Sequence, residues 1–291
     1  MKKLVLVYNP VSGHATFKNK LDYIIEQFQR RDCMLVVYRT QRDNRDLAEF
    51  IRMSGAEGIL AAGGDGTLHE VVNILMREKI HLPVAIIGSG TSNDFAYSLG
   101  VSENLDAYFD HIATGRTRDV DLGLVGNEYF VNVASAGMLT GIAHEVDARF
   151  KNSMGKMAYY LRGLGEIPHF RSLSLHIEAD GEALDEKAFF FIVANSRTVA
   201  SFKNAVPTAQ VDDGRLDLLL IRQCSVPEFM ALAAELVSGR SIIHKKNVYY
   251  RQASSIFVSA ATDVESDLDG ERGPDLPLHI QTVPKAIKMF Y

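Results

Sequence analysis

Cysteine is scarce in this sequence, and that scarcity excludes two kinds of protein. Cys33 and Cys224 are the only two in 291 residues. Their wide separation fits neither a disulfide framework nor the close spacing of a zinc site. Because Cys33 begins an apolar run, we expect both residues to be buried free thiols in a reducing compartment. This predicts a cytoplasmic protein.

Long apolar runs are also absent. No uninterrupted apolar stretch approaches the ~20 residues that a membrane-spanning helix needs. The N-terminus has two lysines and a short apolar run, but it continues into Asn9-Pro10 without a small-residue cleavage site. That pattern argues against a signal peptide. We therefore expect a soluble chain.

Positive charge is not in excess either. The formal net charge is −5, so the protein as a whole does not attract nucleic acid or anionic lipid. Any such attraction has to come from a local patch of basic residues. We expect no nucleic-acid partner.

The first part of the chain alternates between short apolar runs and amphipathic stretches, a pattern typical of a parallel sheet flanked by helices. The length of the chain favours two domains. The predicted strands are 4–8, 33–38, 58–62 and 84–87, and apolar residues at helical spacing fall at 21–28, 47–51 and 68–75. We predict an α/β domain over residues 1–121.

After Asp119 the rhythm changes to strands with few helices between them. Several strands alternate with period two, which suits an antiparallel sheet with one wet face. Asp180-Gly181 predicts a hairpin turn. The predicted strands are 130–133, 173–177, 189–193, 216–221, 256–258 and 276–280, and the predicted helices are 154–164 and 229–236. We predict a mostly β domain over residues 122–291, with the last dozen residues as candidates to return to the first domain.

Three predicted strands of the first domain end in glycine and small polar residues, in the stretches 9–13, 63–67 and 88–94. In an open α/β sheet, ligands bind beyond the carboxyl ends of the strands. Glycine allows backbone N–H groups to approach phosphate, and a following helix adds its positive N-terminal end. Neither the Walker A nor the Rossmann glycine pattern is present. The alternative is that these stretches are ordinary turns.

Two carboxylates favour the phosphate interpretation. Asp65 lies inside the second glycine stretch and Asp94 ends the third. An acid beside phosphate would be repelled unless Mg²⁺ bridges the two, directly or through water. The alternative role for Asp94 is to cap a helix that starts at Phe95, and both roles can coexist.

Acidic residues also gather in two turns of the second domain. Asp212-Asp213-Gly214 leads into a strand, and its simplest interpretation is a hairpin turn. The stretch Asp267–Glu271 follows Asp263 and Glu265. Such a cluster is more often a solvated loop than a functional site, and periodicity does not decide between the two.

Taken together in order, these motifs resemble the diacylglycerol kinase catalytic family, which includes sphingosine kinases, ceramide kinases and bacterial soluble lipid kinases. The resemblance runs essentially from end to end. It rests on Asn9-Pro10-x-Ser12-Gly13, Gly63-Gly64-Asp65-Gly66-Thr67-Leu68-x-Glu70-Val71-Val72-Asn73, Gly90-Thr91-x-Asn93-Asp94-Phe95-Ala96, Asp212-Asp213-Gly214-x-Leu216 and Asp269-Gly270-Glu271. The GGDGT block alone is shared with NAD kinases and, in variant form, with phosphofructokinases.

The resemblance implies an α/β nucleotide domain of the NAD-kinase type, a C-terminal β-sandwich and an active site in the cleft between them. It implies ATP as phosphoryl donor and Mg²⁺ as cofactor. The residues that it implies for ATP binding are Asn9, Pro10, Val11, Ser12, Gly13, His14, Thr40, Gly63, Gly64, Asp65, Gly66, Thr67, Leu68, His69 and Thr91. His69 and Ser92 depart from the family pattern, which more often has Asn at the first position and Gly or Thr at the second.

The resemblance also implies the catalytic and metal-binding residues. Glu271 matches the general base, and Asp65 and Asp94 complete the catalytic acids. A second metal site falls on Asp213, with backbone carbonyls near Gln210 and Arg215. Phosphoryl transfer needs mainly positioning and electrostatic stabilisation. As the general base, Glu271 would accept the proton of the attacking lipid hydroxyl.

The substrate implied is a lipid at a membrane surface, with diacylglycerol as the default and phosphatidylglycerol and sphingoid bases left open. The stretch Arg149–Arg162 has four basic residues, aromatic residues and no acid. It is a candidate for transient membrane contact. The alternative is a helix that packs on the sandwich with its charges solvated. An exposed strand edge in the second domain makes a homodimer possible.

Two other functions compete with the lipid kinase. The first is a kinase of a soluble metabolite such as NAD, which shares GGDGT but pairs it with a later Asn-Glu motif, whereas Asn93-Asp94 stands here. The second is a non-catalytic nucleotide-sensing regulator with a degenerate site. Against the regulator, all the expected acids are present: Asp65, Asp94, Asp213 and Glu271.

Overall fold

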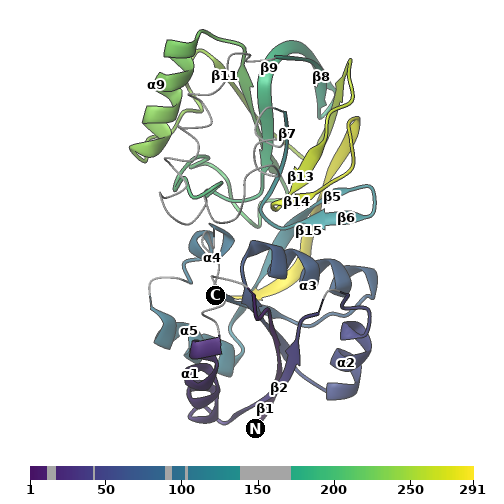
Figure 1. Cartoon of the computed structure of the whole chain (residues 1–291), viewed down its shortest axis with the longest axis vertical. Coiled ribbons are helices and arrows are strands. Elements are labelled where there is room, and N and C mark those ends of the chain that lie inside the picture. The colour runs from purple at the N-terminus through teal and green to yellow at the C-terminus, as the bar shows by residue number, and fades with distance from the viewer. Residues whose placement is uncertain (12–17, 42, 89–93, 102–103, 138–171) are drawn as a thin grey trace. The chain divides into compact units, whose positions relative to one another are not determined.

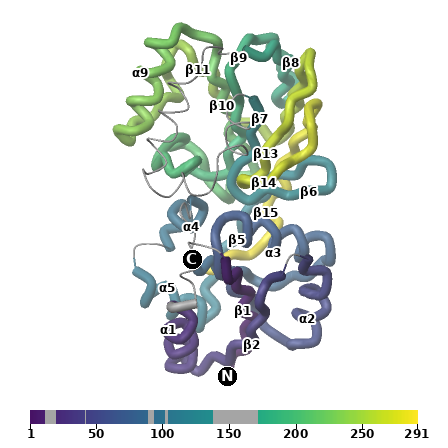
Figure 2. The backbone as a smooth tube through the Cα atoms, in the orientation of Figure 1, coloured from purple at the N-terminus to yellow at the C-terminus, as the bar shows by residue number. Residues whose placement is uncertain are grey.

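The computed structural model describes residues 1–11, 18–41, 43–88, 94–101, 104–137 and 172–291. The chain divides into two compact units, one of residues 1–122 with 284–291 and the other of residues 123–283. Figure 2 follows the backbone through both units. Among the predictions for the second domain, the helix at 154–164 and the stretch Arg149–Arg162 lie outside the described residues.

The first unit is built on a parallel sheet. Its strands lie in the order β2 (Cys33–Arg39), β1 (Lys2–Tyr8), β3 (Gly58–Gly63), β4 (Val84–Gly88) and the C-terminal end of β15 (Leu278–Phe290). All of these pairings are parallel. Strand β3 is buried along its whole length, as a strand covered on both faces must be. The predicted parallel sheet is confirmed.

Helices cover both faces of this sheet (Figure 1). Helices α1 (Lys18–Gln29) and α5 (Leu105–Thr114) contact each other, as do α2 (Leu47–Ser54) and α3 (Asp65–Arg77). A short helix, α4 (Asp94–Ser98), follows the third glycine stretch. Asn104 caps the N-terminus of α5, where its side chain accepts the Ala107 N–H at 3.1 Å, and Gly115 caps the C-terminus in the left-handed region. Both are standard helix signals.

The second unit is a β-sandwich-like arrangement in which the paired strands are antiparallel. Strand β9 (Glu182–Ala194) pairs with β7 (Val133–Gly137), β8 (Leu173–Ala179) and β10 (Leu216–Arg222). The other strands are β6 (Glu128–Phe130), β11 (Val248–Ala253), β12 (Ser255–Ala260), β13 (Ser266–Leu268) and β14 (Glu271–Arg272). Two strands, β5 (Thr117–Val125) and β15, run from one unit into the other.

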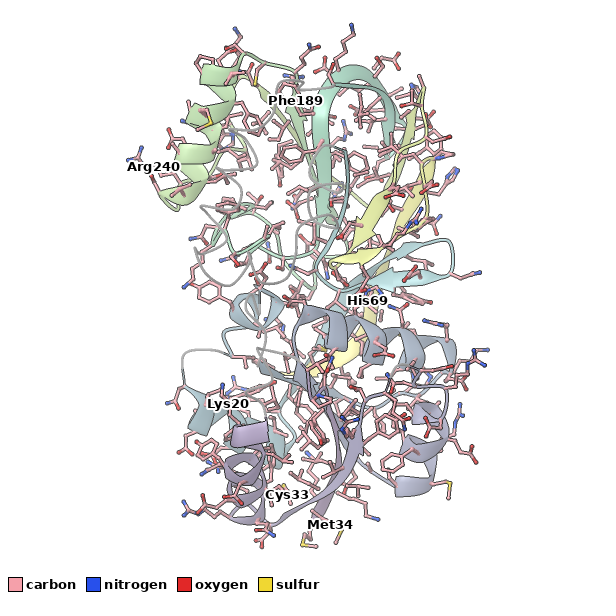
Figure 3. All side chains as sticks on the ribbon, viewed as in Figure 1. Lys20, Cys33, Met34, His69, Phe189 and Arg240 are labelled. Atoms are coloured by element: carbon pink, nitrogen blue, oxygen red, sulfur yellow. The ribbon has the colours of Figure 1, made fainter. Side chains whose placement is uncertain are left out.

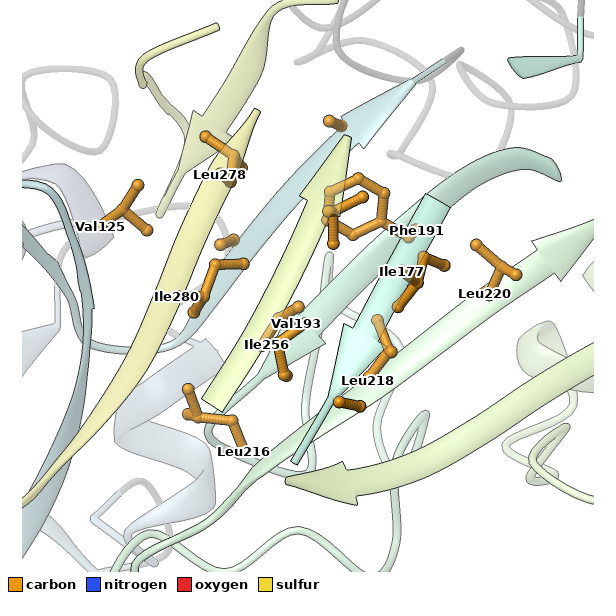
Figure 4. Packing of buried hydrophobic residues seen from close by; sticks show 14 of the residues in the cluster. Val125, Ile177, Phe191, Val193, Leu216, Leu218, Leu220, Ile256, Leu278 and Ile280 are labelled. Carbon is orange, nitrogen blue, oxygen red and sulfur yellow. The ribbon is translucent and has the colours of Figure 1, made fainter. Parts of the chain in front are cut away.

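Alternate residues of β9 and β10 belong to two separate hydrophobic cores. Phe191 and Leu218 lie in the core between the strands, shown in Figure 4. Ile192 and Leu219 lie in a second core with helix α9 (Val226–Val237). Because strand side chains alternate between faces, this burial on both sides explains why β10 and the second half of β9, from Ala188 on, read as nearly continuous apolar runs.

Several sequence predictions of the second unit are corrected. The predicted strand 130–133 is broken, because β6 ends at Phe130 and β7 begins only at Val133. The strand predicted at 276–280 begins at Leu278 and continues to Phe290. Cys33 is buried as expected, but Cys224 is only half-buried, and both thiols are free.

Two further expectations agree with the structure. The hairpin at Asp180-Gly181 joins β8 to β9, with φ angles of 47° and 82°, as a type I′ turn requires. In the described parts of the chain, no helix has both the length and the apolar character needed to cross a bilayer.

Candidate functional site

The predicted nucleotide-binding residues of the first unit follow neighbouring strand ends. Tyr8, the last residue of β1, lies between Arg39 of β2 and Ala62 of β3. The Asn9 N–H donates to the Ala62 carbonyl, and the Thr40 N–H donates to the Tyr8 carbonyl, both at 3.0 Å. Asn9 and Thr40 are thus fixed side by side at the carboxyl edge of the sheet, where open α/β sheets bind ligands.

The Gly63–Thr67 turn continues this edge from β3 into α3. Gly63 pairs with Gly88 at the end of β4. The Asn9 side-chain amide donates to Thr67 Oγ1 at 3.3 Å, so the turns after β1 and β3 are joined. The N-cap residue of α3 is Gly64, which has no side chain to accept the first N–H groups of the helix. A helix N-terminus without a side-chain cap presents its first N–H groups to an anion, and phosphate fits it.

Two predicted ATP contacts, Leu68 and His69, are buried. Leu68 is 2% exposed and His69 is 6% exposed. The His69 ring, labelled in Figure 3, lies 3.3 Å from the side-chain amide of Asn73, one turn further along α3. The exposed side chains at this edge are therefore not those of Leu68 and His69, so a contact from Leu68 to a nucleotide would have to use its backbone.

The remaining predicted residues of this unit differ in how far the structure places them. Pro10 is buried and Val11 is exposed, with the Val11 N–H donating to Asn9 Oδ1 at 3.1 Å. Asp65 opens α3, and Asp94 opens α4 with 5% exposure. Helix α4 thus includes Asp94, one residue earlier than predicted. Ser12, Gly13, His14 and Thr91 lie outside the described residues.

The turn that carries Glu271 joins β13 to β14. Leu268 pairs with Glu271, and the two residues between them, Asp269 and Gly270, have φ angles of 56° and 94°. Two residues with positive φ make a tight type I′ hairpin. Asp269 is 9% exposed, whereas Glu271 is exposed. The solvated-loop interpretation is therefore wrong for Asp269 and compatible with Glu271.

The Asp269 carboxylate accepts three consecutive backbone N–H groups. Its Oδ2 accepts Val131 at 2.7 Å, and its Oδ1 accepts Asn132 at 2.8 Å and Val133 at 3.0 Å. These N–H groups lie in the break between β6 and β7 and at Val133, the first residue of β7. The Asp269 N–H in turn donates to the Val133 carbonyl at 2.8 Å. The break and the turn are therefore one hydrogen-bonded structure.

A buried polar cluster that sequence reasoning missed completes this structure. The Asn195 side chain donates to the Val131 carbonyl, and the Asn195 N–H donates to the Asn132 carbonyl, both at 2.8 Å. Ser196 Oγ donates to Asn132 Oδ1, and the Asn132 side-chain amide donates to the Thr198 carbonyl. The available signal was the polar run Asn195–Thr198 placed directly after an apolar strand.

Comparison with known proteins identifies both parts of the chain. Residues 3–125 match the model of the diacylglycerol kinase catalytic domain, and residues 132–291 match that of the YegS C-terminal NAD kinase beta sandwich-like domain. Over 286 residues the chain is 32% identical to a diacylglycerol kinase of Staphylococcus haemolyticus, covering 98% of this chain and 86% of that protein. The chain belongs to the diacylglycerol kinase family.

Other relatives agree with this assignment. A Bacillus subtilis diacylglycerol kinase is 31% identical over 280 residues, covering 95% of this chain and 92% of that one. A crystal structure of a diacylglycerol kinase from Bacillus anthracis superimposes with a TM-score of 0.80 at 25% identity, covering 100% of this chain and 96% of that one. The predicted family and fold class are confirmed, and the chain is an enzyme of the lipid kinase class.

The predicted metal site of this diacylglycerol kinase family member has oxygen donors only. Asp213 would supply its carboxylate, and Gln210 and Arg215 their carbonyls, a set that suits a hard cation such as Mg²⁺. The Asp213 carboxylate already accepts the Arg215 N–H at 3.0 Å. No group of three or more His, Cys, Asp or Glu side chains that could hold a metal occurs in the described part of the chain. A site built mainly from carbonyls stays a prediction.

Asp217, whose carboxyl interacts electrostatically with Asp213, bears on whether a cation fits the predicted metal site. Asp217 is 1% exposed, and its Oδ1 accepts the Tyr250 hydroxyl at 2.5 Å. Its Oδ2 is buried with no hydrogen-bond partner among the described residues. Burial raises the pKa of Asp217, and the negative charge of Asp213 adds to the rise. A nearby cation would compensate both the buried Oδ2 of Asp217 and the negative charge of Asp213, so the residues present fit one.

Proposed function

We propose that this protein transfers the γ-phosphoryl group of ATP to the hydroxyl of diacylglycerol, with Mg²⁺, to give phosphatidic acid. The relatives' shared name supports the acceptor. One observation supports the donor above all: α3 has a glycine, Gly64, as its N-cap residue, and this N-terminus follows a strand that ends in glycine beside Asn9 and Thr40. That combination suits a polyphosphate.

In this mechanism, the residues of the chain position and neutralise the reacting groups. Backbone N–H groups at the start of α3 bind the phosphates, and Asp65 and Asp94 would hold the Mg²⁺, which neutralises charge on the transferring group when bound. Glu271 accepts the proton of the lipid hydroxyl. The hydroxyl oxygen forms its bond to the γ-phosphorus as the bond from that phosphorus to the β–γ bridging oxygen breaks, and ADP leaves.

A substitution at Glu271 tests the mechanism. Removing a general base typically costs about 10²–10⁴-fold in rate, so Glu271→Gln should lose most turnover while ATP affinity is kept. Glu265→Gln is the matched control, because Glu265 is a nearby acid whose pairing is to Arg272 at 2.8 Å. Near wild-type turnover by Glu271→Gln would show that Glu271 is not the base. Asp65→Asn and Asp94→Asn should instead weaken the use of Mg·ATP.

An acceptor screen separates the competing functions. The purified protein would be given ATP with diacylglycerol, phosphatidylglycerol, a sphingoid base or NAD, and the products identified by mass spectrometry. Phosphatidic acid as the main product supports the proposal. Phosphorylated NAD would favour the kinase of a soluble metabolite, and ATP binding without transfer to any acceptor would favour the nucleotide-sensing regulator.

How the protein reaches its lipid substrate is a separate part of the proposal. We infer that the protein is cytoplasmic and associates transiently with membrane. The basic stretch Arg149–Arg162 supports this inference through its sequence alone. Sedimentation with vesicles that contain or lack anionic lipid tests it, and binding that ignores lipid charge would count against it. Analytical ultracentrifugation tests the possible homodimer.

A further inference from the structure

The break between β6 and β7 gathers three successive N–H groups at one carboxylate. Backbone N–H groups of adjacent strand residues normally point in alternate directions along the sheet. Those of Val131, Asn132 and Val133 all donate to Asp269, at 2.7, 2.8 and 3.0 Å. A carboxylate that accepts several backbone N–H groups makes strong, charge-assisted bonds. Asp269 therefore holds the backbone of this break in one conformation.

The carbonyl groups of the same break are held from elsewhere. Asn195, which is fully buried, donates its side-chain amide to the Val131 carbonyl and its backbone N–H to the Asn132 carbonyl. Both donors and acceptors of the break are thus satisfied within the second unit. A buried segment whose backbone N–H and carbonyl groups are all hydrogen-bonded is held rigidly. The break is a fixed support and not a loose connection.

The turn that begins at Asp269 is fixed to this support. Asp269 takes up a φ of 56° and Gly270 a φ of 94°. A non-glycine residue in the left-handed region costs roughly 1–2 kcal/mol, which the three N–H bonds offset. The Gly270 N–H donates to Asp267 Oδ1 at 2.8 Å. The turn therefore has a single path from Asp269 to Glu271, two residues on.

The two acids of Asp269-Gly270-Glu271 accordingly have different roles. Both oxygens of Asp269 are engaged by backbone N–H groups, and the residue is 9% exposed. The carboxylate of Glu271 is exposed and begins β14. An acid whose two oxygens already accept N–H groups is poorly placed to accept a substrate proton.

We propose that Asp269 is a positioning residue, which fixes Glu271 by binding the Val131–Val133 N–H groups. This inference rests on the proposed function of Glu271 as general base. Asp269 acts through the backbone of the turn and does not touch the reacting atoms. A displacement of about 1 Å in a catalytic group can cost on the order of 10²-fold in rate, so a loosened turn should reduce kcat strongly.

Asp269→Asn is the direct test, because it replaces one oxygen by an NH₂ group, which cannot accept an N–H, and leaves the other as a neutral and weaker acceptor. We expect kcat to fall roughly 10- to 100-fold with the KM for ATP unchanged. Hydrogen exchange at the N–H groups of Val131–Val133 should become faster. Asp275→Asn removes the same charge from an exposed residue nearby whose contact to Arg272 is 4.0 Å long, and it should behave as wild type.

Combination with Glu271→Gln distinguishes positioning from general stability. If Asp269 acts only by positioning Glu271, Asp269→Asn should cause no further loss of kcat in the Glu271→Gln background. Gly270→Ala is a second variant for the case that Asp269→Asn does not fold. A β-carbon at Gly270 meets nothing within 4 Å, yet its φ of 94° is strained for alanine, so the same loss of kcat is expected.

The possible failures can be told apart. Wild-type turnover by Glu271→Gln would overturn the proposed function and the positioning role together. An inactive Glu271→Gln with a wild-type kcat for Asp269→Asn would overturn the positioning role alone. Losses that simply multiply in the double variant, or a raised KM for ATP with kcat unchanged, would likewise overturn it.

Discussion

Thr67 closely approaches Gly63, so that a β-carbon on Gly63 would lie 2.2 Å from Thr67 Oγ1. The same Oγ1 accepts the Asn9 side-chain amide at 3.3 Å. Glycine at position 63 thus allows the turn after β3 to close onto the turn after β1. The arrangement of the proposed phosphate site depends on this absence of a side chain.

Gly63→Ala should therefore damage both stability and nucleotide binding. Forcing an extra methyl group into a packed site typically costs about 1–3 kcal/mol, and Thr67 would have to move away from Asn9. We expect a lower denaturation midpoint and weaker ATP binding by calorimetry. Gly100→Ala is the control for ATP binding: its φ of +75° strains alanine and should lower stability too, but a β-carbon there meets nothing within 4 Å, so ATP binding should be kept. If Gly63→Ala bound ATP as tightly as Gly100→Ala, the close approach would have no bearing on the site.

Tyr108→Phe should destabilise the first unit through strand β4. The Tyr108 hydroxyl, on α5, accepts the backbone N–H of Ile86 at 2.9 Å, and burial raises the pKa of Tyr108. Phenylalanine keeps the ring but leaves that buried N–H without its acceptor, a loss of about 1–3 kcal/mol. Urea denaturation measures it. Tyr23→Phe, at a tyrosine that is 45% exposed, should leave stability unchanged, and an equal effect of the two variants would contradict the explanation.

His176 should titrate above its ordinary range. The side-chain hydrogen bond with Asp185, at 2.7 Å, and then that with Glu178, at 3.2 Å, raise the pKa of His176. Because the pKa of His176 is raised in the folded state, the contribution of these two hydrogen bonds to folding stability is fully present below the unfolded pKa of about 6.5. It is lost as the pH rises through the folded pKa.

Nuclear magnetic resonance titration of the His176 ring checks this direction. Asp185→Asn should lower the pKa of His176 by more than Glu178→Gln does, because the Asp185 contact has the larger effect. The histidine side chain is 39% exposed, so added salt should weaken the shift. A His176 pKa that Asp185→Asn leaves unchanged would show that the contact does not persist in solution.

Much of the first unit could be predicted, because each of its strands is an apolar run that ends in glycine or a polar residue. The carboxyl ends of parallel strands lie at one edge of a sheet, so the adjacency of Asn9, Thr40 and Gly63 followed from strand order. The burial of His69 did not follow. Its ring lies beside Asn73, one helical turn on, and a sequence does not show which face of α3 is covered.

The error at residues 130–133 has a different cause. The residues Phe130–Val133 have the apolar character of a strand, so a continuous strand was the natural prediction. Three N–H groups there instead donate to Asp269, between 136 and 138 residues away. Local pattern does not contain a partner so distant. For the same reason the acids around Asp269 looked like a solvated loop.

The path of β15 has a consequence for the order in which the protein can mature. Residues 284–291 belong to the first unit, yet the whole of residues 123–283 precedes them in the chain. A ribosome releases the N-terminal part of a chain first. The sheet formed by the first 122 residues therefore stays incomplete until the second unit has been translated, because Val84 of β4 lacks its partner Met289. A nascent chain stalled before residue 284 should therefore remain more sensitive to protease in its first 122 residues than the finished protein.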